Sequence, residues 1–143
     1  GDSVAGPELI SPAMFRTFAL PYEKIIVDKS HALGLPYFLH ICGNTSRIID
    51  AMLETGSDGL ELDYKTDALL AHAKMKDRTV FIGNIDPSGV LALGSPQLVE
   101  ETTRELLTVF ADTPRFILNA GCAIPPITPP ENLRAMISTA RSF

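Results

Sequence analysis

Four short apolar runs recur along the chain. They cover residues 36–42, 58–63, 79–85 and 115–122, and leucine, isoleucine and phenylalanine recur in them. An apolar run of this length is typical of a strand that is buried on both faces of a sheet. The pattern therefore predicts four buried strands.

The segments between these runs have the wider apolar spacing of helices. An opening helix from Met14 to Leu33 is expected to be capped by Ser11 and to be kinked or divided at Pro21. Further helices are predicted over residues 44–56, 65–77, 95–112 and 131–143. Strand and helix thus alternate four times along the chain.

This alternation predicts parallel strands joined by right-handed crossovers. Two folds have this order of elements, an open doubly wound sheet and a (β/α) barrel. The first strand is not followed by the G-x-G-x-x-G pattern, so the dinucleotide-binding form of the open sheet has no support. In both folds the functional residues gather at the carboxyl ends of the strands.

Polar residues and cysteines stand at the carboxyl ends of all four predicted strands. They are His40 and Cys42, Glu61 and Asp63, Asn84 and Asp86, and Asn119 and Cys122. Side chains alternate between the two faces of a strand, so His40 and Cys42 lie on the same face of their strand, and Glu61 and Asp63 lie together on one face of theirs. If the last strand stays regular through Gly121, Cys122 shares the face of Leu118 and Ala120.

Histidine, cysteine and carboxylate side chains are the ligands that zinc prefers in proteins. His40, Cys42 and Cys122 would hold a catalytic zinc ion and leave a fourth position for water, for the carboxylate of Glu61 or for a thiol substrate.

Two further roles are predicted for the carboxyl-end residues. Asp63 or Asp86 would orient the His40 ring, and Asn84 and Asp86 are candidate substrate contacts. A structural interpretation stays open beside these roles, because free cysteine is among the residues most often buried in protein cores.

Composition narrows the class of protein. The 143 residues are 45% hydrophobic and 20% charged, as in an ordinary soluble domain. A net charge of −5 argues against a nucleic-acid partner, and no run approaches the roughly 18 apolar residues of a membrane span. The first residues show no secretory signal, and two cysteines in such a chain are expected to be reduced, so a cytoplasmic location is predicted.

Five motifs resemble one known family when taken in this order. They are "LISPAMFRTFALPYEKII", "HICGN", "ETGSDGLELD", "GNIDP" and "PPENLRAM", and together they run nearly from end to end. The chain resembles the C-terminal half of the uroporphyrinogen decarboxylase superfamily. Within it, the chain is most similar to the zinc-dependent methylcobalamin:coenzyme M methyltransferases, whose zinc ligands are a His-x-Cys pair and a distant Cys. His40, Cys42 and Cys122 fall on that pattern.

The resemblance implies an α/β fold that is half of a (β/α)8 TIM barrel, with strands five to eight and their helices in residues 1–143. It implies a methyl transfer from methylcobalamin, carried by a partner corrinoid protein, to a thiol such as coenzyme M on Zn²⁺. Related zinc methyltransferases use a carboxylate as fourth ligand, and Glu61 is the residue expected in that role.

The N-terminal half of the family pattern is absent, so the chain is expected to be a fragment of a longer protein. A half barrel exposes sheet edges and apolar surface, which predicts self-association or a missing N-terminal half. Two alternatives to the methyltransferase remain. One is a uroporphyrinogen decarboxylase-like enzyme, which needs no metal. The other is a non-catalytic fragment that binds zinc or a corrinoid partner.

Overall fold

The sheet is the centre of the molecule. The computed structural model describes residues 2–143, and its four strands are parallel and lie in sequence order. The strands are β1 (Phe38–Ile41), β2 (Gly59–Leu62), β3 (Val80–Ile85) and β4 (Phe116–Ala120). An open doubly wound sheet reverses its strand order at a switch point, whereas a barrel keeps neighbours in sequence order. The observed order is that of a barrel.

Helices connect the strands and flank them. The α-helices are α1 (Pro12–Met14), α2 (Leu20–Ala32), α3 (Ile49–Leu53), α4 (Ala68–Met75), α5 (Pro96–Val109) and α6 (Pro130–Ser142). A short 3₁₀ turn, η1 (Ser3–Ala5), and two π-helical segments, η2 (Phe15–Ala19) and η3 (Pro87–Ala92), complete the elements. Each of the four predicted strands and each predicted helix therefore has a counterpart.

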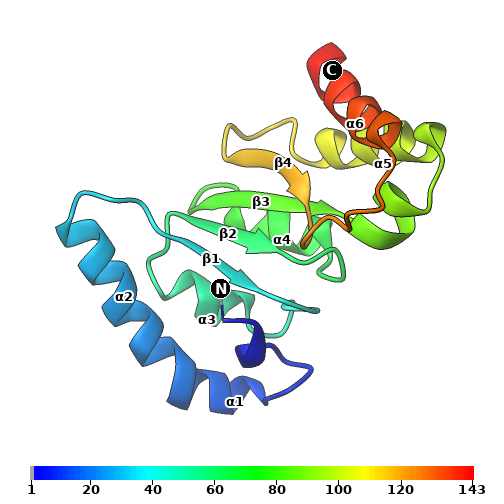
Figure 1. The fold of residues 1–143 in the computed structure, drawn as a ribbon. Helices are drawn as coiled ribbons and strands as arrows, with labels where there is room; N and C mark the ends of the chain where they lie inside the picture. The colour runs from blue at the N-terminus through cyan, green and yellow to red at the C-terminus, as the bar shows by residue number, and fades with distance from the viewer. Residues whose placement is uncertain (1) are drawn as a thin grey trace.

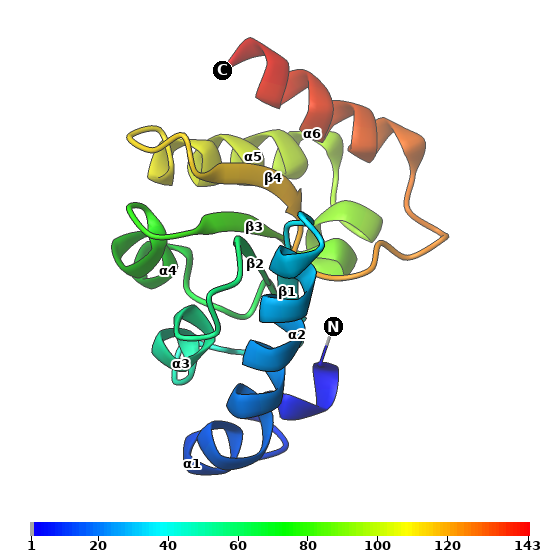
Figure 2. The ribbon, with the colours of Figure 1, turned by 90° about the vertical axis from the view of Figure 1, so that its left-hand side faces the viewer.

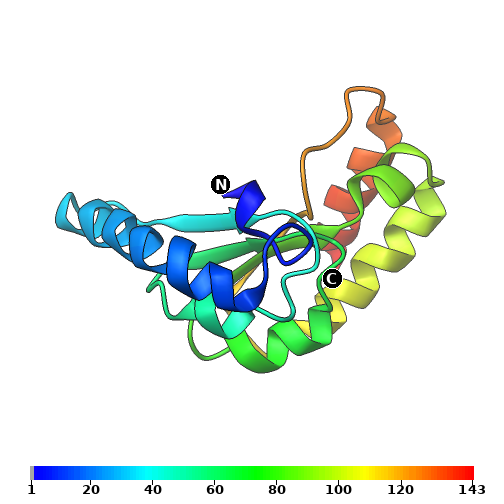
Figure 3. The same cartoon turned by 90° about the horizontal axis from the view of Figure 1, so that it is seen from below.

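The helices α3, α4 and α5 cover one face of the sheet (Figures 2 and 3). The strand side chains that point toward them are fully buried, as Leu39, Leu60 and Phe81 show with no exposed area. Helix α6 packs on α5, and α2 lies along the other flank of the molecule, beyond β1 (Figure 1). The core is therefore the layer between the sheet and its helices.

The opposite face of the sheet is more open. Phe38 on β1 and Ile117 on β4 point to this face and are 50% and 48% exposed. Parallel sheets are normally covered on both faces, because the crossover connections place helices against them and the strand side chains are apolar on both sides. The arrangement has the asymmetry expected of half a barrel, in which the inner face is built only in part.

Local signals in the sequence set several helix boundaries. Ser11 accepts a hydrogen bond from the Met14 amide, and Ser95 accepts one from the Leu98 amide, so both predicted N-caps are confirmed. The predicted interruption near Pro21 is the π-helical segment η2, which ends just before it. Gly34 follows α2 with a φ of 71°, a left-handed conformation that glycine adopts without strain.

The helix predicted over residues 44–56 is too long, because α3 occupies only Ile49–Leu53. The preceding residues make side-chain hydrogen bonds in place of helical ones. The Thr45 amide donates to Thr66 Oγ1, and Asn44 Oδ1 accepts from the Ser46 amide. Short polar side chains compete with helical hydrogen bonding in this way and hold the segment in turns. In the described part of the chain, none of the helices is both long and apolar enough to cross a membrane.

Candidate metal centre

His40 and Cys42 lie at the carboxyl end of β1, on the open face of the sheet. His40 is the third residue of the strand and Cys42 follows its last residue, so the two side chains share a face. His40 Nε2 lies 3.2 Å from Cys42 Sγ. The predicted H-x-C pair is therefore in place.

Cys122 reaches the same space from the far edge of the sheet. Its Sγ lies 4.0 Å from that of Cys42, and the donor atoms of His40, Cys42 and Cys122 all lie within 4.8 Å of one another. The structure thus brings together the three residues that the sequence predicts as zinc ligands.

Cys122 does not arrive in the way that strand alternation predicts. The shared face of Leu118, Ala120 and Cys122 is wrong, because Ala120 is buried in the core layer. Asn119, like Ile117 two residues before it, faces the open side, where it contacts Glu61. The strand ends at Ala120, and the Gly121 amide donates to Ile85 O as the chain turns away, which brings Cys122 to the other face.

The hydrogen bonds of the His40 ring fix its tautomer. Nδ1 lies 3.0 Å from the main-chain oxygen of Glu61, and a carbonyl oxygen can only accept a hydrogen bond. Nδ1 therefore carries the proton of the neutral ring. The lone pair of Nε2 is left facing the two cysteines, as a metal-bound histidine requires.

The donor spacing fits a tetrahedral zinc ion. Zn–S bonds of about 2.3 Å and Zn–N bonds of about 2.0–2.1 Å place two sulfurs about 3.8 Å apart and a nitrogen and a sulfur about 3.6 Å apart. The corresponding separations here are 4.0 Å and 3.2 Å. Two soft sulfur donors with one imidazole nitrogen are also a zinc-type donor set. The residues present fit this metal.

The two thiols differ in their surroundings. Burial raises the pKa of the Cys122 thiol, and the charge and hydrogen bond of Cys42 add to the rise. The amide of Ala123 opposes it by donating to the sulfur. Cys42 Sγ also lies 3.4 Å from Ser3 Oγ, a residue that the sequence did not single out, because η1 packs against the end of β1 only in the folded chain.

Glu61 lies beside the three donors and outside their cluster. One carboxylate oxygen, Oε1, accepts a hydrogen bond of 2.8 Å from Asn119 Nδ2. The other, Oε2, lies 3.5 Å from His40 Nδ1, at the ring edge turned away from the cysteines. In this position the carboxylate would leave the fourth coordination place of a bound metal free. A cavity of about 610 Å³, lined in part by these residues, opens in front of the site.

Asp63 supports the backbone of the site and does not orient His40 as predicted. Its buried carboxylate accepts hydrogen bonds from the amides of Gly43, at 2.8 Å, and Lys65, at 3.0 Å. Gly43 directly follows Cys42, so Asp63 anchors the turn that carries the cysteine. The acceptor for the His40 ring is the main chain of Glu61 instead.

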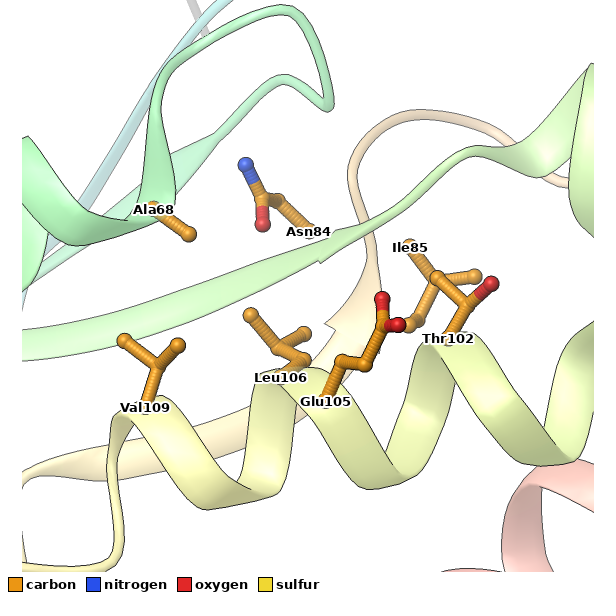
Figure 4. Close-up of a pocket in the computed structure, with 7 residues that line it drawn as sticks. All are labelled: Ala68, Asn84, Ile85, Thr102, Glu105, Leu106 and Val109. Carbon is orange, nitrogen blue, oxygen red and sulfur yellow. The ribbon is translucent and has the colours of Figure 1, made fainter.

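The side chains of Asn84 and Asp86 hydrogen-bond to the main chain away from the metal centre. Asn84 donates to the main-chain oxygens of Asp63 and Thr66, and its side chain lines a separate cavity of about 240 Å³ beside α5 (Figure 4). Asp86 caps η3 by accepting from the amides of Ser88 and Gly89. Neither residue lines the cavity in front of the three donors.

Comparison with known proteins places the chain in a family. The sequence profile of the uroporphyrinogen decarboxylase (URO-D) family matches residues 1–143. The chain belongs to the URO-D family.

Its relatives within the family include two kinds of enzyme. The chain is 35% identical over 142 residues to the methylcobamide:CoM methyltransferase MtbA of Methanosarcina acetivorans, covering 99% of this chain and 40% of that protein. It is 36% identical over 144 residues to the uroporphyrinogen decarboxylase of a Synechococcus species, covering 99% of this chain and 39% of that protein. The chain thus spans about 40% of the length of the relatives it matches.

The fold comparison agrees with the family assignment. The structure superposes on a methyltransferase from Methanosarcina mazei with a TM-score of 0.87 at 29% identity, covering 98% of this chain and 40% of that one. The prediction of an α/β half barrel in the URO-D superfamily is confirmed by the sequential parallel sheet and by this match.

Proposed function

We propose that this member of the URO-D family is part of a zinc-dependent methyltransferase, which moves a methyl group from a methylated corrinoid on a partner protein to a thiol such as coenzyme M. The observation that carries the proposal is the convergence of His40, Cys42 and Cys122, with donor atoms within 4.8 Å. The likeness to methylcobamide:CoM methyltransferases supports it.

Each of the three residues would bind the metal through one donor atom. His40 would bind the metal through Nε2, because Nδ1 donates to the Glu61 carbonyl, and Cys42 and Cys122 would bind it as thiolates. When bound, zinc would supply a Lewis acid that lowers the pKa of a substrate thiol and keeps its sulfur in the nucleophilic form.

The surrounding residues favour a thiol substrate in the fourth position. Asn119 draws the Glu61 carboxylate to the ring edge of His40, so the carboxylate does not fill that position. The cavity in front of the donors leaves room for a small molecule. The substrate sulfur would attack the methyl carbon and form the S–C bond, and the methyl group would leave the electron pair of the broken bond on the corrinoid of the partner protein.

The partners follow from this chemistry. A corrinoid protein would present the methyl group at the carboxyl ends of the strands, where the donors lie. The remainder of the barrel would cover the open sheet face at Phe38 and Ile117, which the chain leaves exposed. Both cysteines are unbridged, which fits a reducing, cytoplasmic setting.

A uroporphyrinogen decarboxylase-like activity is the second candidate. The observation in its favour is the 36% sequence identity to a decarboxylase, which is close to the 35% identity to a methyltransferase. This activity requires no metal, so metal content separates the two candidates.

The first experiment measures zinc per chain after extensive dialysis, by elemental analysis of the chain and of Cys122→Ser. We expect about one zinc per chain, with loss in the variant because one of three protein ligands is gone. Asp86→Ala is the matched control, since it alters a strand-end residue outside the cavity and should keep its zinc.

Zinc in the wild type, lost only in Cys122→Ser, supports the methyltransferase. Absence of zinc from the wild type contradicts it and moves the decarboxylase-like candidate ahead. The second step is an assay of methyl transfer from methylcobalamin to coenzyme M by the complete barrel protein. If the zinc-loaded protein transfers no methyl group, the methyltransferase proposal is wrong and only zinc binding stands.

A further inference from the structure

Asn119 makes a contact that spans two strand spacings. Its side chain extends from β4 across β3 to β2, where Nδ2 donates to Glu61 Oε1 at 2.8 Å. On β3, Glu61 pairs with Ile82 and Asn119 pairs with Asn84, so the contact runs diagonally across that strand. The Glu61 carboxylate is the polar partner of this amide among the described residues.

The two oxygens of Glu61 have different neighbours. Oε1 is bonded by Asn119, and Oε2 lies 3.5 Å from His40 Nδ1. Because the carboxylate is planar and rigid, holding one oxygen narrows the positions open to the other. Asn119 thereby determines how close the negative charge stands to the His40 ring.

We propose that Asn119 is a positioning residue of the metal centre, which holds the Glu61 carboxylate beside the His40 ring and away from the open coordination position. The inference rests on the proposed zinc site and deepens it. Asn119 would act on the metal through Glu61 and His40, since its side-chain hydrogen bond goes to Glu61.

The carboxylate has two possible effects on the metal, and its position decides between them. Beside Nδ1–H it raises the electron density of the ring and strengthens Nε2 as a ligand. Turned toward the donors it is itself a zinc ligand and competes with the substrate thiol. The Glu61 side chain is 34% exposed, so solvent leaves it room to turn once the amide is removed.

Asn119→Asp is the sharpest perturbation of this contact. It keeps the shape of the side chain, removes the donor and sets two carboxylates against each other. Glu61→Gln is its counterpart, and in the double variant Asn119→Asp/Glu61→Gln the glutamine can donate to the aspartate. The exchange restores the hydrogen bond with donor and acceptor reversed.

The measurement is zinc affinity, by competition with a chelating dye. We expect the zinc affinity of Asn119→Asp to differ from that of wild type by about tenfold or more. The affinity falls where Glu61 only leaves the His40 ring, and it rises where Glu61 becomes a ligand. The double variant should recover to near the affinity of Glu61→Gln alone, because residues that act as one unit are not additive. Asn44→Asp adds a similar charge in an exposed turn and should leave the affinity unchanged.

A second measurement reports the open position directly. The Co²⁺-loaded proteins are titrated with 2-mercaptoethanol, and the sulfur-to-cobalt absorption is followed. In Asn119→Asp the released Glu61 should compete, so the thiol should bind more weakly than in wild type. A purely structural role for Asn119 would change the unfolding midpoint without this spectral change.

The outcomes separate this inference from the function on which it rests. If wild type binds zinc and Asn119→Asp matches it within about twofold, the positioning role is wrong and the zinc site stands. The same holds if the zinc affinity of the double variant differs from that of Glu61→Gln by more than about twofold. If wild type binds no zinc, both fail.

Discussion

Replacing Gly121 with alanine tests how the last strand delivers Cys122 to the metal centre. A Cβ at this position would lie 2.9 Å from both Cα and Cβ of Tyr64 and would also collide with the Tyr64 amide nitrogen. Real Cβ atoms essentially never approach other atoms so closely. The obstacle is backbone, which cannot move aside as the end of a flexible side chain would.

The size of the effect follows from this contact. Overpacking of a tight site costs about 1–3 kcal/mol, because the chain must shift to make room. Gly121 immediately precedes Cys122, so the shift moves the sulfur relative to Cys42, 4.0 Å away. Changes that only orient metal ligands cost about 10–100-fold in affinity, and the displacement of a ligand should cost at least about tenfold.

The assay compares Gly121→Ala with Gly34→Ala in urea unfolding and in zinc competition. Gly34 has open space around it and a φ of 71°, so alanine there costs about 1–2 kcal/mol through backbone strain alone. It lies before β1, at the end of the strand away from the donors. The two variants should lose similar stability, and only Gly121→Ala should lose zinc affinity.

Two results would refute this reasoning. Zinc affinity unchanged in Gly121→Ala would mean that the turn after β4 does not set the position of Cys122. Equal loss of zinc affinity in both variants would mean that stability, and not local geometry, controls the site.

Three further predictions concern residues outside the donor cluster. Burial, with the nearby Asp2 charge, raises the pKa of Glu23 above its usual 4.5. The free energy of unfolding of the wild type should therefore fall as pH rises from about 4.5 through the pKa of the folded state. In urea unfolding, Glu23→Gln should raise this free energy relative to wild type more at pH 7 than at pH 4. Thr103 Oγ1 is buried without a partner among the described residues, so Thr103→Val should raise the unfolding free energy by about 1 kcal/mol, measured against the half-buried Thr102→Val. Asp86→Ala should lower the melting temperature through the loss of a cap worth about 1 kcal/mol, with zinc affinity unchanged.

The order and kind of the elements could be predicted because both depend on local signals. Apolar runs and capping residues such as Ser11 and Ser95 act within a few positions of themselves, and the structure keeps them. The segment before α3 could not be predicted, since its turn is held by Thr66, which comes from another part of the chain. A single sequence without its fold does not show such a bond.

The residues of the candidate site likewise fall into those that local patterns predict and those that long-range contacts place. His40 and Cys42 follow from alternation within one regular strand, and their placement needed no other information. The sequence correctly predicted that Cys122 lies at the carboxyl end of the last strand. The predicted face was wrong, because the alternation of β4 stops at Ala120, two residues before the cysteine. Asn119 and Ser3 gain their contacts only when distant segments meet, although the position of Asn119 at a strand end was a visible signal.

The distance between the two cysteines also bears on the fold itself. They come from β1 and β4, the outer strands of the sheet, which are three strand spacings or about 14 Å apart in a flat arrangement. Their sulfurs are 4.0 Å apart, so the carboxyl end of the sheet must curl and the chain must turn inward after β4. A metal ion bound there would link the two edges of the half barrel. Zinc should accordingly stabilise the curvature that brings its own ligands together, and ligand loss should loosen β1 and β4 before the central strands.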